Sequence, residues 1–411
     1  MVIDWRRKKG KAKSELLASN MPRFLLGLFL GVNLVFGFFF FKICFQPVSV
    51  VLPHHNLVKD KRLEFLKIIA QKRPFTRHIV LIGPDHFSSN QTGIFYADTD
   101  WNLNNGQLFF DQSLTISGLT LNNNLLKSDH SIYNILSNLK SVFPQAQVFP
   151  ILIGQKYPLA DLHNLLTQIN SVCRFDCLFI ASVDFSHYLP AAVADVHDQQ
   201  SLLVLQNLNV QSLNQLEVDS PQSLYILTQF SKVKKAQYFD LFSHTNSGFL
   251  AGNPITETTT HLMGSYQKTL SSKTISPVTT FTFAQNVDPK NQSVSLGDRF
   301  FYGVNQLNSN LSFPHNVTAD ITLNPTKDVN SIVKNQNHLT INFSPDIAVS
   351  GFVKNSQLTL VFSPLTRQGN QVFFDRSPAR LTKIQSILSS FSSNLSVLSS
   401  NLTYGSVIIN L

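Results

Sequence analysis

The sequence predicts an α/β protein with a central, largely parallel sheet flanked by helices, preceded by one transmembrane helix and followed by a small α+β accessory domain. Three observations support this prediction. Between residues 48 and 286, short apolar runs alternate with amphipathic stretches, a pattern typical of strands joined by helices. Residues 24–41 form an apolar run without a charge. From residue 290 to residue 411, Ser and Asn become abundant and alternating strands are few.

The predicted strands are short apolar runs, which is typical of parallel strands buried on both faces. They are VSVVLP (48–53), HIVLIGP (78–84), QVFPILIG (147–154), CLFIASVDF (from Cys177) and AQYFDLFSH (236–244). The predicted helices carry apolar residues at helical spacing or begin with a proline in the first turn. They cover residues 59–72, 131–143, 158–172 and 191–235, the last broken at 217–221.

The N-terminal segment predicts a membrane anchor. A basic head over residues 1–23 holds seven Lys/Arg against two acidic residues, and the apolar run follows it directly. With Lys42 snorkelling, the run reaches the roughly 20 residues that a membrane span needs. A cleaved signal peptide is the alternative, but its apolar region is usually shorter and ends at small residues. We expect an uncleaved signal anchor over 24–45, a cytoplasmic head, and an extracytoplasmic main domain.

The charge distribution argues against nucleic-acid binding. The formal net charge is +9, but the basic head supplies five of these charges and Lys42 another. The rest of the chain therefore has no basic stripe of the kind that nucleic-acid-binding proteins carry. Three cysteines in a chain of this length argue against a disulfide framework. We expect Cys173 and Cys177 to be packing residues and not a metal-binding pair.

Histidines and carboxylates follow three of the predicted strands. The residues are His54 and His55, Asp85 and His86, and Asp184 and His187. Because the carboxyl ends of parallel strands meet at one edge of the sheet, these side chains are expected to converge there. Imidazoles with a carboxylate are ligands of divalent transition metals. For Asp184 and Ser186 alone, a capped turn is the simpler interpretation.

Four blocks in this order resemble the Memo family, which includes the AmmeMemoRadiSam system protein B and is similar to class III extradiol dioxygenases. They are LPHH (52–55), LIGPDHF (81–87), SDHSIYNILSNLKSVFPQAQVFPILIG (128–154) and IASVDFSHY (180–188). The resemblance covers residues 48–286 and implies a Memo-like domain there. It implies that His54 and His86 are metal ligands and that His130, Asp184 and His187 line the same pocket. His55 departs from the family's Pro-His-Ala pattern.

The third metal ligand is open in this resemblance. Many family members have a Cys-Gly-x-x-Pro-Ile block, and here the matching block is EVDSPQS, with Glu217 at the Cys position and Asp219 nearby. Glu217 is the expected ligand and Asp219 the alternative. In the non-functional interpretation, Asp219 caps the helix at Pro221 and Glu217 faces solvent. A carboxylate in place of a thiolate favours Fe(II), with Zn(II) or Cu as alternatives.

The resemblance implies a metal-dependent oxidoreductase of the dioxygenase-like superfamily, with His187 as general acid/base oriented by Asp184. A non-enzymatic envelope protein that binds a metal or a peptide in the same pocket is the alternative, and a hydrolytic zinc enzyme is the third. The substrate is not predicted. The family name also implies AMMECR-like and radical-SAM partners. These are expected in the cytoplasm, so the predicted topology argues against such a partnership.

Overall fold

In the computed structural model, the chain from Pro47 onward forms one unit. The described residues are 47–411 apart from 89–90, 190, 253–257, 270–278, 284–307, 314–316, 324–330, 345, 355, 369–370, 376, 378, 392–396, 402–405 and 411. The predicted anchor at 24–45 lies outside them. Among the helices that are described, none combines the length and the apolar character needed to span a membrane.

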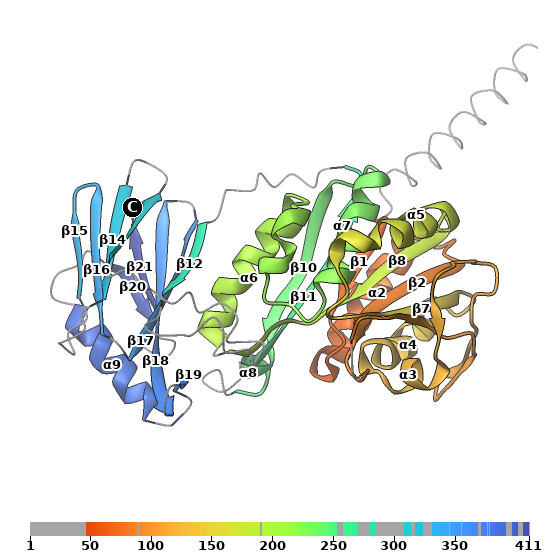
Figure 1. The fold of residues 1–411 in the computed structure, drawn as a ribbon, viewed down its shortest axis with the longest axis horizontal. Helices are drawn as coiled ribbons and strands as arrows, with labels where there is room; N and C mark the ends of the chain where they lie inside the picture. Colours follow the sequence, from red (N-terminus) through yellow and green to blue (C-terminus); the bar gives the residue numbers. More distant parts are fainter. Residues whose placement is uncertain are drawn as a thin grey trace, which may run out of the picture. The chain divides into compact units, whose positions relative to one another are not determined.

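A nine-stranded sheet forms the centre of residues 47–269 (Figure 1). Four adjacent strands run parallel in the order β1-β8-β2-β7, and antiparallel strands flank them on both sides. The parallel strands are β1 (Ser49–Leu52), β8 (Cys177–Ser182), β2 (His78–Asp85) and β7 (Gln147–Gly154). The flanking strands are β10 (Tyr238–Asn246), β11 (Thr258–Gln267), β3 (Ile94–Tyr96) and β6 (Thr120–Leu121), with β9 (Phe185–Leu189) paired to β11. The predicted α/β class and largely parallel sheet are confirmed.

Helices cover both faces of this sheet because its strands are apolar on both sides. Val51 packs into one core together with α5 (His163–Val172) and α7 (Pro221–Val233). Its neighbours Val50 and Leu52 pack into the other core with α2 (Lys59–Lys72) and α4 (His130–Val142). Successive side chains of a strand point to opposite faces, so one short apolar run contributes to two hydrophobic cores. Both cores hold the strand ends in fixed register.

Several further elements lie around this sheet. They are the helices η1 (Asn56–Val58), α3 (Asn123–Ser128), η2 (Leu159–Leu162), α6 (Ala191–Gln206), η3 (Val210–Gln215) and α8 (Ser247–Leu250), and the hairpin of β4 (Trp101–Leu103) and β5 (Gly106–Leu108). The prediction of mainly helical structure from 191 to 235 matches α6, η3 and α7. The small strands between residues 94 and 121 were not predicted.

The C-terminal region contains two further sheets and one helix. A six-stranded sheet holds β12 (Thr279–Phe283), β17 (Ile347–Lys354), β18 (Gln357–Gln368), β19 (Gln371–Phe374), β20 (Val397–Asn401) and β21 (Ser406–Asn410). A four-stranded sheet holds β13 (Asn308–Phe313), β14 (Val317–Leu323), β15 (Ser331–Asn335) and β16 (His338–Phe343). The helix is α9 (Arg380–Phe391). Strand β12 pairs with β17 and so belongs to this region, although it lies within residues 48–286, the range that the resemblance covers.

The two cysteines before β8 form a disulfide, which corrects the prediction that they are only packing residues. Helix α5 ends at Val172 and β8 begins at Cys177, so the chain reverses direction between them. This reversal brings the Cα atoms of Cys173 and Cys177 to 5.1 Å, within disulfide reach. Both residues are buried.

Candidate metal centre

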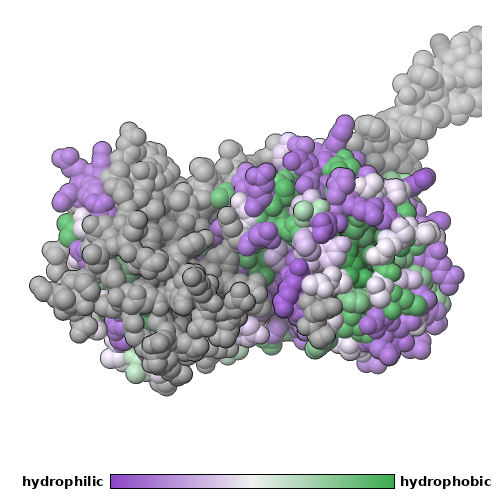
Figure 2. Space-filling model, viewed as in Figure 1, coloured by the Kyte–Doolittle hydropathy of each residue, from purple (hydrophilic) through white to green (hydrophobic). Residues whose placement is uncertain are grey.

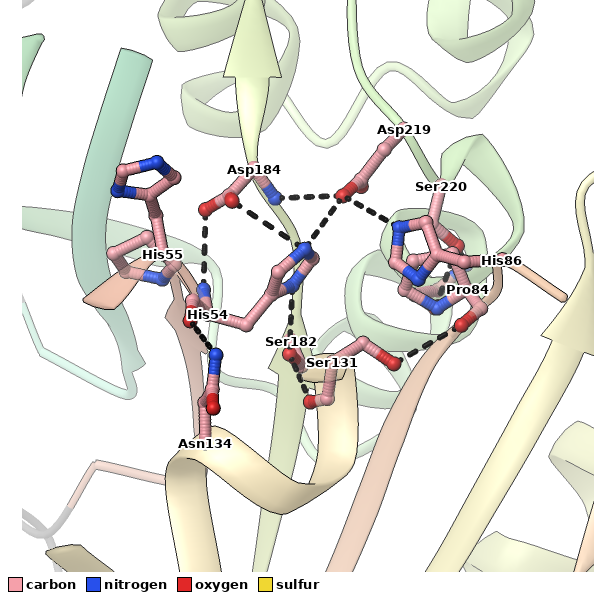
Figure 3. A network of polar contacts seen from close by, with 12 residues as sticks. His54, His55, Pro84, His86, Ser131, Asn134, Ser182, Asp184, Asp219 and Ser220 are labelled. Carbon is pink, nitrogen blue, oxygen red and sulfur yellow. Dashed lines mark hydrogen bonds and ion pairs between the residues drawn. The ribbon is translucent and has the colours of Figure 1, made fainter. Parts of the chain in front are cut away.

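Polar residues gather where β1, β2 and β8 end, at one edge of the sheet (Figure 3). His54 follows β1, His86 follows β2, and Asp184 follows β8. Asp219 comes from the segment between η3 and α7, where its backbone N–H donates to the carbonyl oxygen of Asp184. The parallel strands therefore bring together groups that lie up to 165 positions apart in the sequence.

The hydrogen bonds of His54 define its tautomer. The Ser182 hydroxyl donates its single proton to the carbonyl oxygen of Ser131, with Oγ and O at 2.6 Å. Ser182 Oγ also lies 3.1 Å from His54 Nδ1, and with its proton already used it acts there as the acceptor. His54 therefore carries its proton on Nδ1, and its Nε2 presents a lone pair.

This lone pair faces two carboxylate oxygens. His54 Nε2 lies 3.3 Å from Asp184 Oδ2 and 3.2 Å from Asp219 Oδ2, and all three side chains are buried. Burial lowers the pKa of His54 to about 4, so the imidazole is neutral near pH 7. Burial also raises the pKa of Asp219 to about 6 and raises the pKa of Asp184. Lone pairs and anionic oxygens at these distances repel one another unless a cation or an additional proton lies between them.

His86 is oriented by a buried carboxylate. Its Nδ1 lies 2.9 Å from Asp129 Oδ1, and its backbone N–H donates to Asp129 Oδ2. Asp129 also accepts from Ser131 N as the N-cap of α4, so helix and imidazole share one carboxylate. Burial lowers the pKa of His86, but the bond to Asp129 and the charge of Asp219 outweigh it and raise the pKa. His86 Nε2 then points into the site, 4.0 Å from Asp219 Oδ2.

His130, the first residue of α4, completes a cluster of three imidazoles. Its ring stacks on His86 with centroids 4.1 Å apart and meets His54 edge-on at 5.0 Å. Burial, reinforced by the neighbouring imidazoles, lowers the pKa of His130 to about 4. One ligand atom from each of His54, His86 and His130 lies within 4.8 Å of the others, and the same holds for His54, Asp184 and Asp219. Both sets share His54.

Asp219, and not Glu217, supplies the carboxylate beside the two histidines. Glu217 was the expected third ligand, but it belongs to neither set of candidate ligands among the described residues. It is buried, so the prediction of a solvent-facing Glu217 is also wrong. The helix-capping interpretation of Asp219 fails too, because Ser220 is the N-cap of α7 and accepts from Ser223 N.

The sequence predicted that Asp184 orients His187, but in the structure Asp184 contacts His54 instead. Its Oδ1 accepts from the backbone N–H of His54, and its Oδ2 faces the ring of the same residue. His187 lies in β9, where burial lowers its pKa to about 4 although the charge of Asp219 raises it. Its buried Nδ1 has no hydrogen-bond partner among the described residues. His187 is thus a neutral imidazole near the carboxylates.

His261 was missed by the sequence analysis. It lies inside β11, fully buried, and neither ring nitrogen has a hydrogen-bond partner in the described part of the chain. Its ring lies 5.0 Å from the ring of His55, the residue that departs from the family pattern. Burial lowers the pKa of His261 to about 3, with the charges of His55 and His187 acting in the same direction. The only signal in the sequence is a histidine inside an otherwise uncharged strand.

The fold and the site together define an α/β protein with a histidine and carboxylate centre at the carboxyl edge of a parallel sheet. The family model described as Memo-like protein matches residues 44–256, about half of the chain. The chain therefore belongs to the Memo-like family.

Curated relatives agree with this assignment. A MEMO1 family protein of Thermoplasma volcanium is 23% identical over 219 residues, which cover 49% of this chain and 79% of the relative. A MEMO1 family protein of Methanosarcina barkeri is 26% identical over 233 residues, which cover 52% of this chain and 87% of the relative. Among solved structures, an uncharacterised protein of Escherichia coli K12 matches 52% of this chain and 98% of its own, with 10% identity and a TM-score of 0.34. That score is too low to support an inference.

Proposed function

We propose that the Memo-like domain binds one divalent transition metal ion through His54, His86 and Asp219, and that it is a metal-dependent oxidoreductase of the extradiol dioxygenase-like superfamily. The observation that carries the proposal is the buried lone pair of His54 Nε2, which faces two carboxylate oxygens at 3.2 and 3.3 Å. A bound cation would turn this repulsion into attraction. Two imidazoles and a carboxylate are also the donor set that suits Fe(II).

The surrounding residues fit a metal ligand set. Ser182 and Asp129 hold the Nδ1 atoms of His54 and His86, so both Nε2 lone pairs are directed into the site. Such outer partners fix the tautomer and raise the basicity of metal-binding imidazoles. Fe(II) in this set would supply open coordination positions for a substrate oxygen and for dioxygen. The neutral imidazoles of His130 and His187 each have a nitrogen that can hold a substrate proton.

We also propose that this domain lies outside the cytoplasm, on the predicted membrane anchor. The buried Cys173–Cys177 disulfide supports this location, because disulfides persist in oxidising compartments. This location would separate the domain from cytoplasmic AMMECR-like and radical-SAM partners. Protease treatment of intact cells tests it, because an external domain is cleaved and a cytoplasmic one is protected.

Metal analysis of the purified full-length chain tests the proposed function. We expect about one iron per chain, oxygen consumption with a catechol panel, and loss of the metal in His86→Ala. His163→Ala is the matched control, since His163 is exposed at the start of α5. Bound zinc with esterase or amidase activity would instead identify a hydrolytic enzyme. Metal binding without either activity would identify the alternative, a non-enzymatic metal- or peptide-binding envelope protein.

A further inference from the structure

The opposite edge of the sheet, where the parallel strands begin, lies at the point where the described chain starts. The buried guanidinium of Arg73 holds three backbone segments together there. It donates to the carbonyl oxygen of Pro47 at 2.6 Å and to those of Phe175 and Cys177 at 2.7 Å each. We call this the strand-start edge: Pro47, residues 72–77, residues 174–177, residues 232–238 and Lys268.

Large apolar side chains are exposed at this edge. Phe175 is 67% exposed, the highest value among the large hydrophobic residues described, and Phe75 is 55% exposed. Val233, at the end of α7, is 50% exposed. The end of α7 lies against the start of β1, where the hydroxyls of Ser231 and Ser49 are 2.6 Å apart. Exposed apolar side chains that gather at one edge of a fold indicate an interaction surface.

Exposed cations accompany these apolar groups. Lys72 ends α2, and the other cations come from the loops and from the ends of α7 and β11: Arg77, Arg174, Lys232, Lys235 and Lys268. The carboxylate of Asp176 lies at the same edge, 3.7 Å from Nε2 of His78. On the face shown in Figure 2, hydrophilic and apolar residues are interspersed around α5 and α7. The strand-start edge thus combines positive charge with exposed aromatic rings.

The sequence limits how far this edge can lie from the predicted anchor. The anchor ends at residue 45, and Pro47 is already held by Arg73. Two fully extended residues span about 7 Å. An anchored domain therefore keeps its strand-start edge next to the bilayer, where Phe side chains bury at the boundary of headgroups and acyl chains and Lys and Arg are attracted to anionic lipid.

We propose that the strand-start edge docks onto the surface of an anionic lipid bilayer, with Phe75 and Phe175 at the headgroup level and the surrounding Lys and Arg on lipid phosphates. The inference rests on the proposed anchor and adds an orientation to it. Because His54 and His86 lie at the other end of the same strands, the metal centre then faces away from the membrane. Its ligands are reached from the aqueous side.

Tryptophan quenching in proteoliposomes tests this orientation with the full-length chain. In a Trp5→Phe background the remaining tryptophan is Trp101, which is buried at 3% exposure. Phe175→Trp places a probe at the strand-start edge. Phe87→Trp is the matched control, because Phe87 is 58% exposed and lies at the metal edge. In vesicles of brominated phosphatidylglycerol, we expect at least threefold more quenching at position 175 than at position 87.

Two further variants keep the test decisive. Phe75→Trp probes the same edge from another loop and should give the same result if Phe175→Trp misfolds. Combined Arg174→Glu, Lys232→Glu and Lys235→Glu should reduce the quenching at position 75 at least twofold. A chain without these three charge reversals should show the same reduction in quenching when the vesicles consist of brominated zwitterionic lipid.

The outcomes separate this inference from the anchor on which it rests. A chain that fails to float with the vesicles overturns both. A floating chain in which positions 75 and 175 are quenched no more than position 87 overturns the orientation alone. Protection of position 175 from aqueous iodide without quenching by brominated lipid would identify a protein contact there. This result would also overturn the proposed orientation.

Discussion

Two clusters in this molecule have similar composition but differ in how their polar atoms are satisfied. One is the candidate metal centre of His54, His86 and Asp219. The other consists of Asp195 and Asp198 on α6 and His244 on β10, one ligand atom of each lying within 4.8 Å of the others. By residue type and spacing alone, either cluster would qualify as a metal site.

The second cluster is complete without a metal. Asp198 Oδ1 accepts from the hydroxyls of Ser186 and Thr260, each at 2.9 Å. Asp198 Oδ2 lies 2.7 Å from His244 Nε2. Burial lowers the pKa of His244, but the hydrogen bond to Asp198 and the charge of Asp198 outweigh it and raise the pKa. In the candidate metal centre, by contrast, Asp219 Oδ1 is buried and has no hydrogen-bond partner among the described residues. Unsatisfied lone pairs, more than composition, distinguish a cation site from a structural network.

The largest expected effect tests which cluster binds the metal. Asp219→Ala should weaken metal affinity by about a thousandfold, because it removes the anionic ligand and leaves two imidazoles. Isothermal titration with the apo protein measures this loss. Asp195→Ala is the control and should retain the wild-type affinity. If Asp195→Ala loses the metal and Asp219→Ala retains it, the comparison is reversed.

Removing the central carboxylate of the second cluster should affect stability and not metal binding. Asp198→Ala leaves Ser186, Thr260 and His244 without their shared acceptor, which is expected to cost about 3–5 kcal/mol of unfolding free energy. Urea denaturation of the metal-free chain measures this cost. Asp195→Ala should cost less, since Asp195 lies 4.0 Å from His244 and is partly exposed. An unchanged midpoint for Asp198→Ala would show that this network is not structural.

The sequence predicted the scaffold of the candidate metal centre better than the carboxylate that lies beside its histidines. Buried parallel strands leave a clear pattern of apolar runs, so the ends of β1, β2 and β8 and the convergence of His54 and His86 could be predicted. Glu217 and Asp219 are two residues apart, and the sequence alone does not determine which carboxylate faces the histidines. Asp219 lies beside the end of β8 because its backbone N–H donates a hydrogen bond to the carbonyl oxygen of Asp184. This hydrogen bond is a tertiary contact, which the local sequence does not reveal. His261 was missed because nothing local marks a buried histidine as unpartnered.

Replacing Asp129, the carboxylate that orients His86, should have a smaller effect on metal affinity than replacing Asp219. Asp129→Asn keeps a side-chain oxygen for the cap of α4, but an amide is a weaker acceptor for His86 Nδ1–H. We expect a 10- to 100-fold loss of metal affinity, which is typical when such outer partners are changed. Asp111→Asn is the matched control, because Asp111 pairs with His78 at the opposite edge of the sheet. Equal affinities in the two variants would contradict the role of Asp129.

The smallest expected effect concerns the unpartnered imidazole of His261. His261→Leu should stabilise the metal-free chain by about 1–3 kcal/mol at pH 7, because it removes buried polar atoms that have no hydrogen bonds. The folded pKa of about 3 lies below the ordinary value of 6.5, so at lower pH the unfolded state binds a proton that the folded state rejects. The stability advantage of His261→Leu over the wild type should therefore grow as the pH falls from 6.5 to 5. A difference in thermal midpoint between the variant and the wild type that stays constant over that pH range would contradict this prediction.

The most direct test of the central claim is an anomalous difference map of a crystal of the full-length chain loaded with Fe(II). We predict one strong peak within bonding distance of His54 Nε2, His86 Nε2 and a carboxylate oxygen of Asp219. A peak between Asp195, Asp198 and His244, or none beside His54, would contradict the claim that unsatisfied lone pairs mark the cation site in this fold.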